Sequence, residues 1–467
     1  MSLIKSISGI RGTIGGLPGD NLTPFDALDF IVAFSSQLKN KFPEIKNPSI
    51  VLGRDGRKSG SLLHEFVRSS LCLNGINVID IDLATTPTVE MTVISQKAQG
   101  GIILSASHNP RDWNALKLLN EKGEFISAKE GKELLQLIES SKNIFSKVDD
   151  LGEVISYKTA LEEHIEAIMK LQLVNVTAIK KRKFKIVVDA INSVGALALP
   201  KLLEALGIED VEIINGEMNG EFAHNPEPLD VNLEEIKKRV KKSGADLGIV
   251  VDPDVDRLAF IDERGEMFGE EYTLVVVADY VLRNYCACLY QKISISNLSS
   301  SRALKDITEQ KGGSYYATAV GEVNVVEKMK EAGAVIGGEG NGGIIYPELH
   351  YGRDALVGIA LFLSFIAEDN EKLSEIKQRY PQYEMIKDKI QLDESINVKE
   401  LLHKVKEYYQ GENITDIDGI KIDWEDSWLH LRASNTEPII RIYAEAKTKE
   451  KAEEKVKGIK GFLADFR

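Results

Sequence analysis

Cysteine is scarce in this chain, and its scarcity excludes two classes of protein. Cys72, Cys286 and Cys288 are the only three in 467 residues, and their spacing suits neither a disulfide framework nor a CxxC metal site. The first residues, MSLIKSISGIRG, lack the apolar core of a secretory signal peptide. We therefore expect a protein of the reducing cytoplasm and not a secreted, disulfide-stabilised one.

Long apolar runs and excess positive charge are also missing. The longest apolar run, ALVGIALFLSFIA at 355–367, is shorter than the roughly 20 residues that span a bilayer, so it predicts a buried helix and no membrane partner. The net charge of −14 repels nucleic acid and acidic membrane surfaces. Any phosphate that the protein binds must therefore be held locally, by arginine side chains, backbone N–H groups or a metal ion.

What the chain does have is a pattern that occurs three times. The segments SIVLGRDGRKSG, FKIVVDAINSVGA and KISISNLSSSRAL each begin as an apolar strand and lead through small or polar residues into a helical pattern. Each is followed by a further strand that ends in an unusual loop, in IILSASHNP, LGIVVDPDVDR and AVIGGEGNGG. Strands that are apolar throughout, separated by amphipathic helices, are typical of α/β layers. The sequence predicts three similar α/β domains with mixed sheets, each offering one loop.

The last part of the chain has a different pattern. Apolar residues at helical spacing in VKELLHKVKEYY and in the final Lys/Glu-rich segment flank three strand-like runs, GIKID, SWLHLRAS and PIIRIYAEA. They predict a small C-terminal α+β domain with an antiparallel sheet. Together with the chain length, the patterns predict four domains, at 1–150, 151–262, 263–372 and 373–467. The basic run KKRK at 180–183 is expected to be a solvated segment before a strand.

The loop DPDVDR places Asp252, Asp254 and Asp256 at alternate positions. In an extended segment these carboxylates share one face, where they repel one another unless a cation lies between them. An all-oxygen set of ligands favours Mg²⁺ over zinc. The spacing also fits an EF-hand, but Arg257 occupies the position that needs glycine, and LAFI continues as a strand. A solvated acidic turn is the remaining alternative.

The loop GGEGNGG satisfies the GxGxxG pattern of dinucleotide sites. No helix is expected after it, because IIYPELHYG is an apolar run broken by Pro347, and a pyrophosphate would therefore find no helix N-terminus. We expect instead that the glycines let the backbone approach a ligand, with Glu339 and Asn341 available for hydroxyl groups. A purely structural glycine turn is the alternative.

A fourth loop, RASNTEPIIR, joins two strands of the predicted C-terminal domain. It offers a guanidinium group, hydroxyls and successive backbone N–H groups, which suit a phosphate dianion. The residues concerned are Arg432, Ser434, Asn435 and Thr436. A turn without a ligand is again the alternative.

Ser107 lies beside His108 in SASHNP, which raises the question of a Ser-His hydrolase. No GxSxG turn surrounds the serine, and the histidine is adjacent in sequence. The residues around Ser107 therefore do not match those of a Ser-His hydrolase. In chain order, however, the motifs SGIRG, SASHNP, HNPEPL, DPDVDR, GGEGNGG and RASNTEP resemble those of the α-D-phosphohexomutase family. This family includes the phosphoglucomutases, phosphomannomutases and phosphoglucosamine mutases, and the ordered set of motifs spans the whole chain.

The resemblance implies a four-domain fold with the loops around one central cleft, and a role for each loop. Ser107 matches the phosphoserine that carries a phosphoryl group between the two ends of a hexose. Mg²⁺ is implied between Asp252, Asp254, Asp256 and a phosphoserine oxygen. The phosphoserine gives its phosphoryl group to a hexose monophosphate. The bound hexose 1,6-bisphosphate then turns end for end and returns its other phosphate to the serine.

Further residues take roles on the same resemblance. Arg257 and Arg11 are implied to lie near the transferring phosphate, and Lys117 and His108 are both candidates for moving the hydroxyl proton. The loop containing Arg432 is implied to grip the phosphate that does not react, which positions the other end of the sugar. Hexose phosphates are therefore the expected partners, and the expected oligomeric state is a monomer or a homodimer.

The glycine loop departs from the family's commonest sugar loop, GE-x-SGH. Asn341 stands in the serine position and Gly343 in the histidine position. Similar GEGNGG loops are found in phosphoglucosamine mutases and in bifunctional phosphoglucomutase/phosphomannomutases, and the N-terminal ISGIRGTIGG favours the glucosamine branch. A phosphatase that hydrolyses the phosphoserine would share every motif. A sugar-phosphate-binding protein without turnover would usually lack the serine or an aspartate, and this chain has them all.

Overall fold

The computed structural model describes residues 2–6, 9–140, 145–285, 291–391, 398–433 and 439–464. These residues form two compact units, one of 1–280 with 341–375 and one of 281–340 with 376–467. Ser434, Asn435 and Thr436 of the predicted phosphate loop lie outside the described residues. No described helix is long and apolar enough to cross a membrane.

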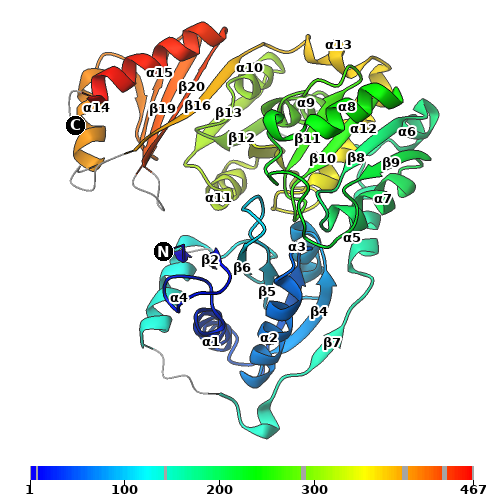
Figure 1. Ribbon diagram of the computed structural model, residues 1–467, viewed down its shortest axis with the longest axis vertical. Helices are drawn as coiled ribbons and strands as arrows, with labels where there is room; N and C mark the ends of the chain where they lie inside the picture. Colours follow the sequence, from blue (N-terminus) through cyan, green and yellow to red (C-terminus); the bar gives the residue numbers. More distant parts are fainter. Residues whose placement is uncertain are drawn as a thin grey trace. The chain divides into compact units, whose positions relative to one another are not determined.

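The first unit begins with a seven-stranded sheet in the order β1-β2-β6-β5-β3-β4-β7 (Figure 1). Its strands are β1 (Ile4–Ser6), β2 (Gly9–Thr13), β3 (Ser49–Arg54), β4 (Asn77–Leu83), β5 (Gly100–Leu104), β6 (Trp113–Leu119) and β7 (Val154–Ser156). β7 therefore joins this sheet although it lies past residue 150, where the first domain is predicted to end.

Helices cover both faces of this sheet. They are α1 (Pro24–Lys41), α2 (Gly60–Leu73) and α4 (Ala128–Ser140) on one face and α3 (Thr86–Ser95) on the other. Because successive side chains of a strand point to opposite faces, Ile50 and Leu52 of β3 pack in one core and Val51 in the other. This double burial explains the unbroken apolar runs in the sequence.

A second sheet of the same unit has the order β11-β10-β8-β9. Its strands are β8 (Lys185–Asp189), β9 (Asp210–Ile214), β10 (Leu247–Val251) and β11 (Leu258–Asp262). The helices of this part are α5 (Ala160–Met169), α6 (Val176–Arg182), α7 (Gly195–Ala205), α8 (Glu234–Ser243) and the first part of α9 (Glu270–Asn284), which continues past the unit's limit at Tyr280. The later segment adds β15 (Gly343–Ile345), α12 (Ala355–Asp369) and α13 (Leu373–Lys377).

Two expectations about local structure are tested in this region. α12 contacts α5, α6, α7 and β11 and is buried on all sides over its first three turns, so the predicted buried helix is confirmed. The basic run at 180–183 is solvated as expected, but it forms the end of α6. Basic side chains in a last helical turn interact favourably with the free carbonyls there.

The predicted repeat is confirmed by the strand order. β3 lies between its parallel partners β4 and β5, and antiparallel β6 follows; β8, β9, β10 and β11 repeat this arrangement. In the second unit, β12 (Ile293–Asn297) lies between parallel β13 (Ser314–Thr318) and β14 (Ile336–Glu339). The three unusual loops follow β5, β10 and β14. They therefore leave the carboxyl end of the same strand in each repeat, where α/β folds commonly carry their sites.

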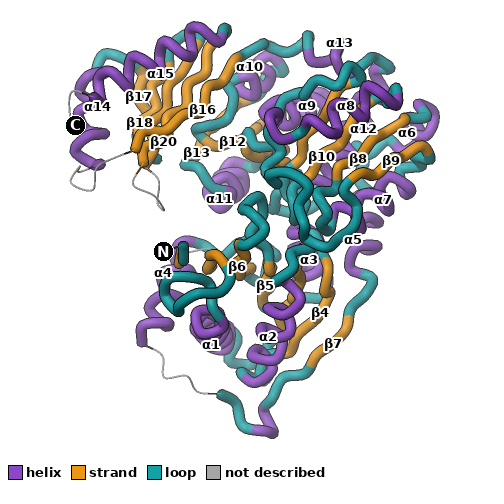
Figure 2. The backbone as a smooth tube through the Cα atoms, in the orientation of Figure 1, coloured by secondary structure: helices purple, strands orange, loops and turns teal. Residues whose placement is uncertain are grey.

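The second unit also contains α10 (Ala303–Gln310), α11 (Glu322–Ala332) and the predicted α+β domain. The domain consists of β16 (Glu384–Gln391), α14 (Val398–Tyr408), β17 (Asn413–Thr415), β18 (Ile420–Asp423), β19 (Ser427–Ala433), β20 (Ile439–Ala446) and α15 (Lys449–Ala464). All pairs in its sheet, in the order β16-β20-β19-β18-β17, are antiparallel as expected. Figure 2 shows α15 lying along these strands, and its apolar residues complete their core.

Candidate active site

The serine loop, residues 105–110 after β5, is held through its main chain. Arg57, whose side chain is fully buried, donates from Nη2 to the carbonyl oxygens of Ser107 (2.5 Å) and Asn109 (2.7 Å), and from Nη1 to that of Pro110 (2.5 Å). Ser107 has a φ of +48°, which costs free energy for a residue with a Cβ. The arginine contacts offset this cost and fix the direction of the serine side chain.

The Ser107 hydroxyl points to the acidic loop. Its Oγ donates to Asp252 Oδ2 at 2.6 Å and lies 3.4 Å from His108 Nδ1. Ser107 is only 7% exposed. The structure therefore brings together the serine of the first repeat and the first aspartate of the second.

The aspartate loop, residues 252–257 after β10, brings its three carboxylates to one point. Asp252, Asp254 and Asp256 are fully buried, and each offers an oxygen within 4.8 Å of the others. The expected reason, alternation along an extended segment, is wrong. The loop is a turn in which Val255 has a φ of +62° and its N–H donates to the Asp252 carbonyl at 3.1 Å. The turn, and not strand geometry, aims the carboxylates.

Three side chains from other elements hold these carboxylates. Lys117 Nζ of β6 lies 2.6 Å from Asp254 Oδ2, and Thr86 Oγ1 of α3 donates to the same oxygen at 2.6 Å. Arg353 Nη2 lies 2.8 Å from Asp256 Oδ2. Among the described residues, nothing donates a hydrogen bond to the buried Oδ1 atoms of Asp254 and Asp256. Two buried carboxylate oxygens without donors fit a metal ion that prefers oxygen ligands.

The charges of the cluster support the same conclusion. Burial and repulsion from Asp256 and Asp254 raise the pKa of Asp252 well above its usual range. Burial also favours a raised pKa for Asp254, but Lys117 outweighs it and the net shift is downward. Burial favours a lowered pKa for Lys117, but the two carboxylates beside the lysine outweigh burial, and the net shift of its pKa is upward. The lysine is thus a fixed positive charge, and a further cation would favour full ionisation of the cluster.

The other residues expected near the transferring phosphate carry positive charge or a neutral ring. Arg257 Nη1 lies 3.3 Å from Glu227 Oε1, in the HNPEPL segment. Arg11 is exposed on β2, which pairs with the strand that carries Lys117. Burial lowers the pKa of His108 well below its usual range, and the charges of Arg257, Arg353 and Arg11 lower it further. The imidazole is therefore neutral near pH 7.

The residues expected to bind substrate divide between the two units. In the second unit, Glu339 Oε1 accepts hydrogen bonds from Asn297 Nδ2 (2.8 Å) and from the Gly321 N–H (3.2 Å). Arg432 Nε lies 3.0 Å from Asp418 Oδ2.

In the first unit, Asn341 Oδ1 accepts from the Gly343 N–H at 3.2 Å. The glycine loop is followed by β15 and not by a helix, which agrees with the exclusion of a dinucleotide site.

Three residues that contact the serine and aspartate loops could not be identified from motifs in the sequence. Arg57 could have been suspected, because the polar GRDGR follows a buried strand. Thr86 and Arg353 gave no signal, since their contacts to the aspartates join distant segments. Gly343 explains the room for Arg353: a Cβ at this glycine would lie 2.4 Å from Arg353 Cδ. The position where the family's commonest loop has histidine is therefore filled from a neighbouring segment.

Family models match nearly the whole chain. The four domain models of phosphoglucomutase/phosphomannomutase match in order: the α/β/α domains I, II and III at residues 3–144, 162–265 and 270–383, and the C-terminal domain at 383–459.

Individual proteins agree with these matches. A phosphoglucomutase/phosphomannomutase of Thermococcus kodakarensis is 37% identical over 95% of the chain and 96% of its own length. A probable phosphoglucosamine mutase of Pyrococcus horikoshii is 34% identical, with 96% and 95% covered. The crystal structure of a Burkholderia thailandensis phosphoglucomutase/phosphomannomutase family protein superimposes with a TM-score of 0.82 at 24% identity, over 97% of this chain and 94% of that one. At this identity the structural likeness concerns the fold alone.

Proposed function

The chain belongs to the phosphoglucomutase/phosphomannomutase family and is an enzyme that moves phosphate within hexose phosphates, and we propose that it is a phosphoglucosamine mutase. In this proposal it interconverts glucosamine 6-phosphate and glucosamine 1-phosphate. The route is a phosphoserine at Ser107 and a bound hexose 1,6-bisphosphate.

The observation that carries the proposed mechanism is the position of the Ser107 hydroxyl. Its Oγ lies 2.6 Å from Asp252 Oδ2, at the edge of a buried carboxylate cluster with two oxygens that accept no hydrogen bond from a described residue. A phosphoryl group on this oxygen would lie against the cluster. Asp252, Asp254 and Asp256 would hold Mg²⁺ with a phosphoserine oxygen, and Mg²⁺ bound there supplies positive charge that neutralises the transferring group.

The surrounding side chains provide the rest of the chemistry. Lys117 keeps its proton between two carboxylates, so it contributes fixed positive charge. Arg257 and Arg11 hold phosphate oxygens. His108 is neutral and close to the serine, and it accepts the proton of the attacking hexose hydroxyl. These assignments turn the two open candidates for proton transfer into separate roles, with His108 as the base and Lys117 as the cation.

The remaining site residues bind the part of the substrate that does not react. Arg432, with Ser434, Asn435 and Thr436, binds the second phosphate. Glu339 accepts hydrogen bonds from sugar hydroxyls, and Asn341 accepts hydrogen bonds from them or donates hydrogen bonds to them. Because the bisphosphate must bind in both directions, recognition is roughly symmetric about the ring. Binding energy at the remote end orients the reacting end for in-line transfer.

The choice of sugar rests on relatives and on the N-terminal segment. The 34% identical Pyrococcus relative is named a probable phosphoglucosamine mutase, and the N-terminal ISGIRGTIGG favours that branch. A bifunctional phosphoglucomutase/phosphomannomutase is the second candidate, which the 37% identical Thermococcus relative favours. Both functions use the same serine and metal loops and differ in how the sugar hydroxyls and the 2-amino group are recognised.

Kinetics with three substrates test the proposal. We expect kcat/KM for glucosamine 1-phosphate to exceed those for glucose 1-phosphate and mannose 1-phosphate by at least about tenfold, the discrimination available when a buried polar group loses its partner. Ser107→Ala sets the background rate. A higher value for glucose or mannose would assign the second function. Release of inorganic phosphate instead of bisphosphate, in a single turnover of phosphorylated enzyme, would contradict mutase activity altogether.

A further inference from the structure

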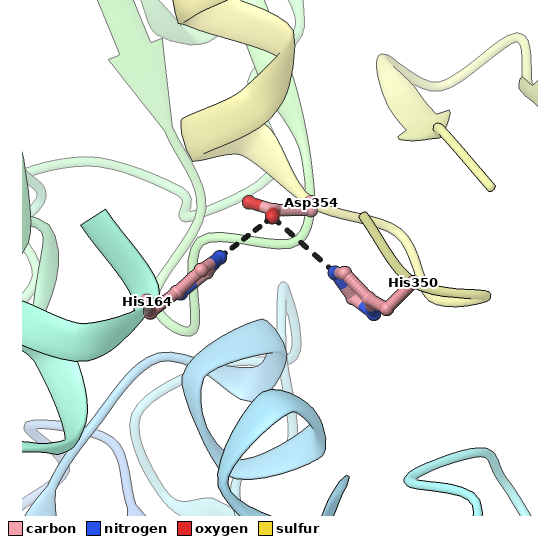
Figure 3. A group of neighbouring side chains, drawn as sticks. All are labelled: His164, His350 and Asp354. Atoms are coloured by element: carbon pink, nitrogen blue, oxygen red, sulfur yellow. Dashed lines mark hydrogen bonds and ion pairs between the residues drawn. The ribbon is translucent and has the colours of Figure 1, made fainter. Parts of the chain in front are cut away.

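Immediately beyond Arg353 lies a second buried cluster, made of His164, His350 and Asp354 (Figure 3). His164 comes from α5, His350 from the segment after β15, and Asp354 is the N-cap of α12. The Nε2 atoms of both imidazoles point to one carboxylate oxygen. His164 Nε2 lies 2.9 Å and His350 Nε2 3.3 Å from Asp354 Oδ2. We call this group the His–Asp–His cluster.

The second nitrogen of each imidazole faces α3. His164 Nδ1 lies 3.1 Å from Thr88 Oγ1, and His350 Nδ1 lies 3.4 Å from Glu90 Oε2. His164 therefore connects α3 to Asp354 by hydrogen bonds, and His350 lies between Glu90 of α3 and Asp354 while its Nδ1 makes no hydrogen bond to a described residue. The other oxygen of Asp354 accepts from the N–H groups of Leu356 and Val357 at the start of α12, so the carboxylate is held from both sides.

The two segments that the cluster connects are the segments that hold the aspartate loop. On α3, Thr86 donates from its hydroxyl to Asp254 Oδ2 and from its N–H to the Asp254 carbonyl, at 2.6 and 2.9 Å. Beside Asp354, Arg353 reaches Asp256 Oδ2 at 2.8 Å, and the Ala355 N–H donates to the Val255 carbonyl at 3.2 Å. A change in the spacing of the two segments would shift these carboxylates relative to one another.

Charge makes the connection stiff. Burial alone would raise the pKa of Asp354, but His164 and His350 outweigh burial and lower it, so the carboxylate remains ionised. Hydrogen bonds to an ionised acceptor in a buried environment are strong, and the 2.9 Å contact of His164 is the shorter of the two. The cluster is thus suited to fixing a distance.

We propose that the His–Asp–His cluster positions the aspartate loop for metal binding, by fixing α3 and the segment of Arg353 relative to each other. The inference rests on the proposed function in that the loop is taken to hold a divalent cation. His164, His350 and Asp354 are positioning residues, since they reach the loop through Thr86 on α3 and through Arg353 and Ala355 beside Asp354. Residues that orient metal ligands from outside typically change metal affinity by about 10- to 100-fold when replaced.

Direct metal binding tests this role without any assay of turnover. Mn²⁺ binding to the purified full-length protein, followed by electron paramagnetic resonance, should be at least about tenfold weaker in His164→Ala and His350→Ala than in wild type. His164→Gln keeps an amide N–H that can reach Asp354, so it should bind Mn²⁺ within about threefold of wild type. The matched control is His403→Ala, because His403 is a histidine on α14 with a side chain 70% exposed. It should match wild type.

A kinetic arm adds a readout that general loosening of the fold would not give. In the alanine variants, the Mg²⁺ concentration for half-maximal activity should rise about tenfold, while KM for the sugar phosphate stays within about twofold. Equal Mn²⁺ affinity in wild type and in folded alanine variants would overturn the proposal. If the alanine variants do not fold, His164→Gln decides: affinity outside the threefold range overturns it, and affinity within that range supports it.

Two further outcomes separate this inference from its neighbours. Elemental analysis of wild type that finds a second metal ion, absent from the cluster variants, would make the cluster a metal centre and overturn its role as a purely hydrogen-bonded support. A wild-type protein that binds Mn²⁺ but converts no hexose phosphate would contradict the proposed function. In that case the Mn²⁺ affinities of the variants would still decide the positioning role.

Discussion

The serine loop and the aspartate loop occupy the same place in two repeats, yet only the aspartate loop is also held through its charged side chains. Both follow the third strand of their repeat and precede an antiparallel fourth strand, β6 or β11. Arg57 holds the serine loop through main-chain carbonyl oxygens. These contacts do not involve the hydroxyl of Ser107. The aspartate loop also has main-chain contacts, from Thr86 and Ala355, but Lys117, Thr86 and Arg353 hold it through its carboxylates as well.

The two kinds of support have different consequences for the side chains of the loops. A support that acts on the main chain determines where a side chain points but leaves its electrostatics unchanged. A support that acts on a carboxylate also changes its pKa and its affinity for a cation. Substitutions around the serine loop should therefore affect geometry, and those around the aspartate loop should affect metal binding. The four predictions below test this distinction, from the largest expected effect to the smallest.

Removing the hydroxyl of the serine loop should have the largest effect. Ser107→Ala should lose at least about 10⁴-fold in mutase kcat, because the covalent intermediate cannot form, while sugar phosphate still binds. Intact mass should show one phosphate on wild type and none on the variant. Retention of most of the activity would refute the phosphoserine mechanism and with it the assignment of this loop.

Removing one charge from the aspartate loop should have the second largest effect on activity. Asp254→Asn should lower kcat by about 10³-fold and raise the Mg²⁺ requirement, because the metal loses one of few ligands and Lys117 loses its partner. Titration with Mg²⁺ after treatment with a chelator measures both effects. The chelator should silence wild type and Mg²⁺ should restore it. Full activity of wild type in the chelator would rule out the metal assignment.

Weakening the support of the serine loop should change geometry without changing the metal requirement. Arg57→Lys removes the planar fork that reaches several carbonyls, so kcat should fall by about 10- to 100-fold with an unchanged half-maximal Mg²⁺ concentration. Arg111→Lys is the matched control, because Arg111 lies beside the same loop and is largely exposed. A Mg²⁺ requirement that rises with Arg57→Lys would erase the distinction between the two loops.

The smallest effect should come from crowding Arg353. Gly343→Ala places a Cβ 2.4 Å from Arg353 Cδ, so the arginine must shift away from Asp256. We expect a rise of about three- to tenfold in the Mg²⁺ requirement, as for other indirect changes to a metal site. Gly458→Ala serves as the control, because no atom lies within 4 Å of a Cβ at that helical position. An unchanged Mg²⁺ requirement would show that Arg353 tolerates the shift.

The sequence predicted those parts of the molecule that local patterns determine. The three repeats, the buried α12 and the antiparallel C-terminal sheet follow from the period of the apolar residues, which reflects burial directly. The convergence of the three aspartates could be expected from their chemistry. Its cause could not, because a valine gives no sign that it will adopt a positive φ, as Val255 does.

The contacts that support the candidate site could not be predicted from the sequence, for a different reason. Thr86 and Arg353 reach the aspartate loop from segments far away along the chain, and neither lies in a recognisable motif. His164, His350 and Asp354 are likewise separated in sequence, so only the folded chain reveals that they meet. The roles of Ser107, the aspartates, Arg257 and Arg432 remain predictions that the experiments above test.

The discontinuity of the first unit has a consequence for how the enzyme is made. Arg353 and α12 belong to this unit, yet the ribosome adds them only after the strands β12 to β14 of the other unit. A nascent chain that ends at Tyr280 contains the serine and all three aspartates but not the arginine and the apolar helix on which they rest. During synthesis the surface that α12 will cover stays exposed, and the aspartate loop lacks its contacts with Arg353 and Ala355 until the intervening segment has emerged. The three aspartates are therefore synthesised well before Arg353 and α12, the elements that complete their surroundings.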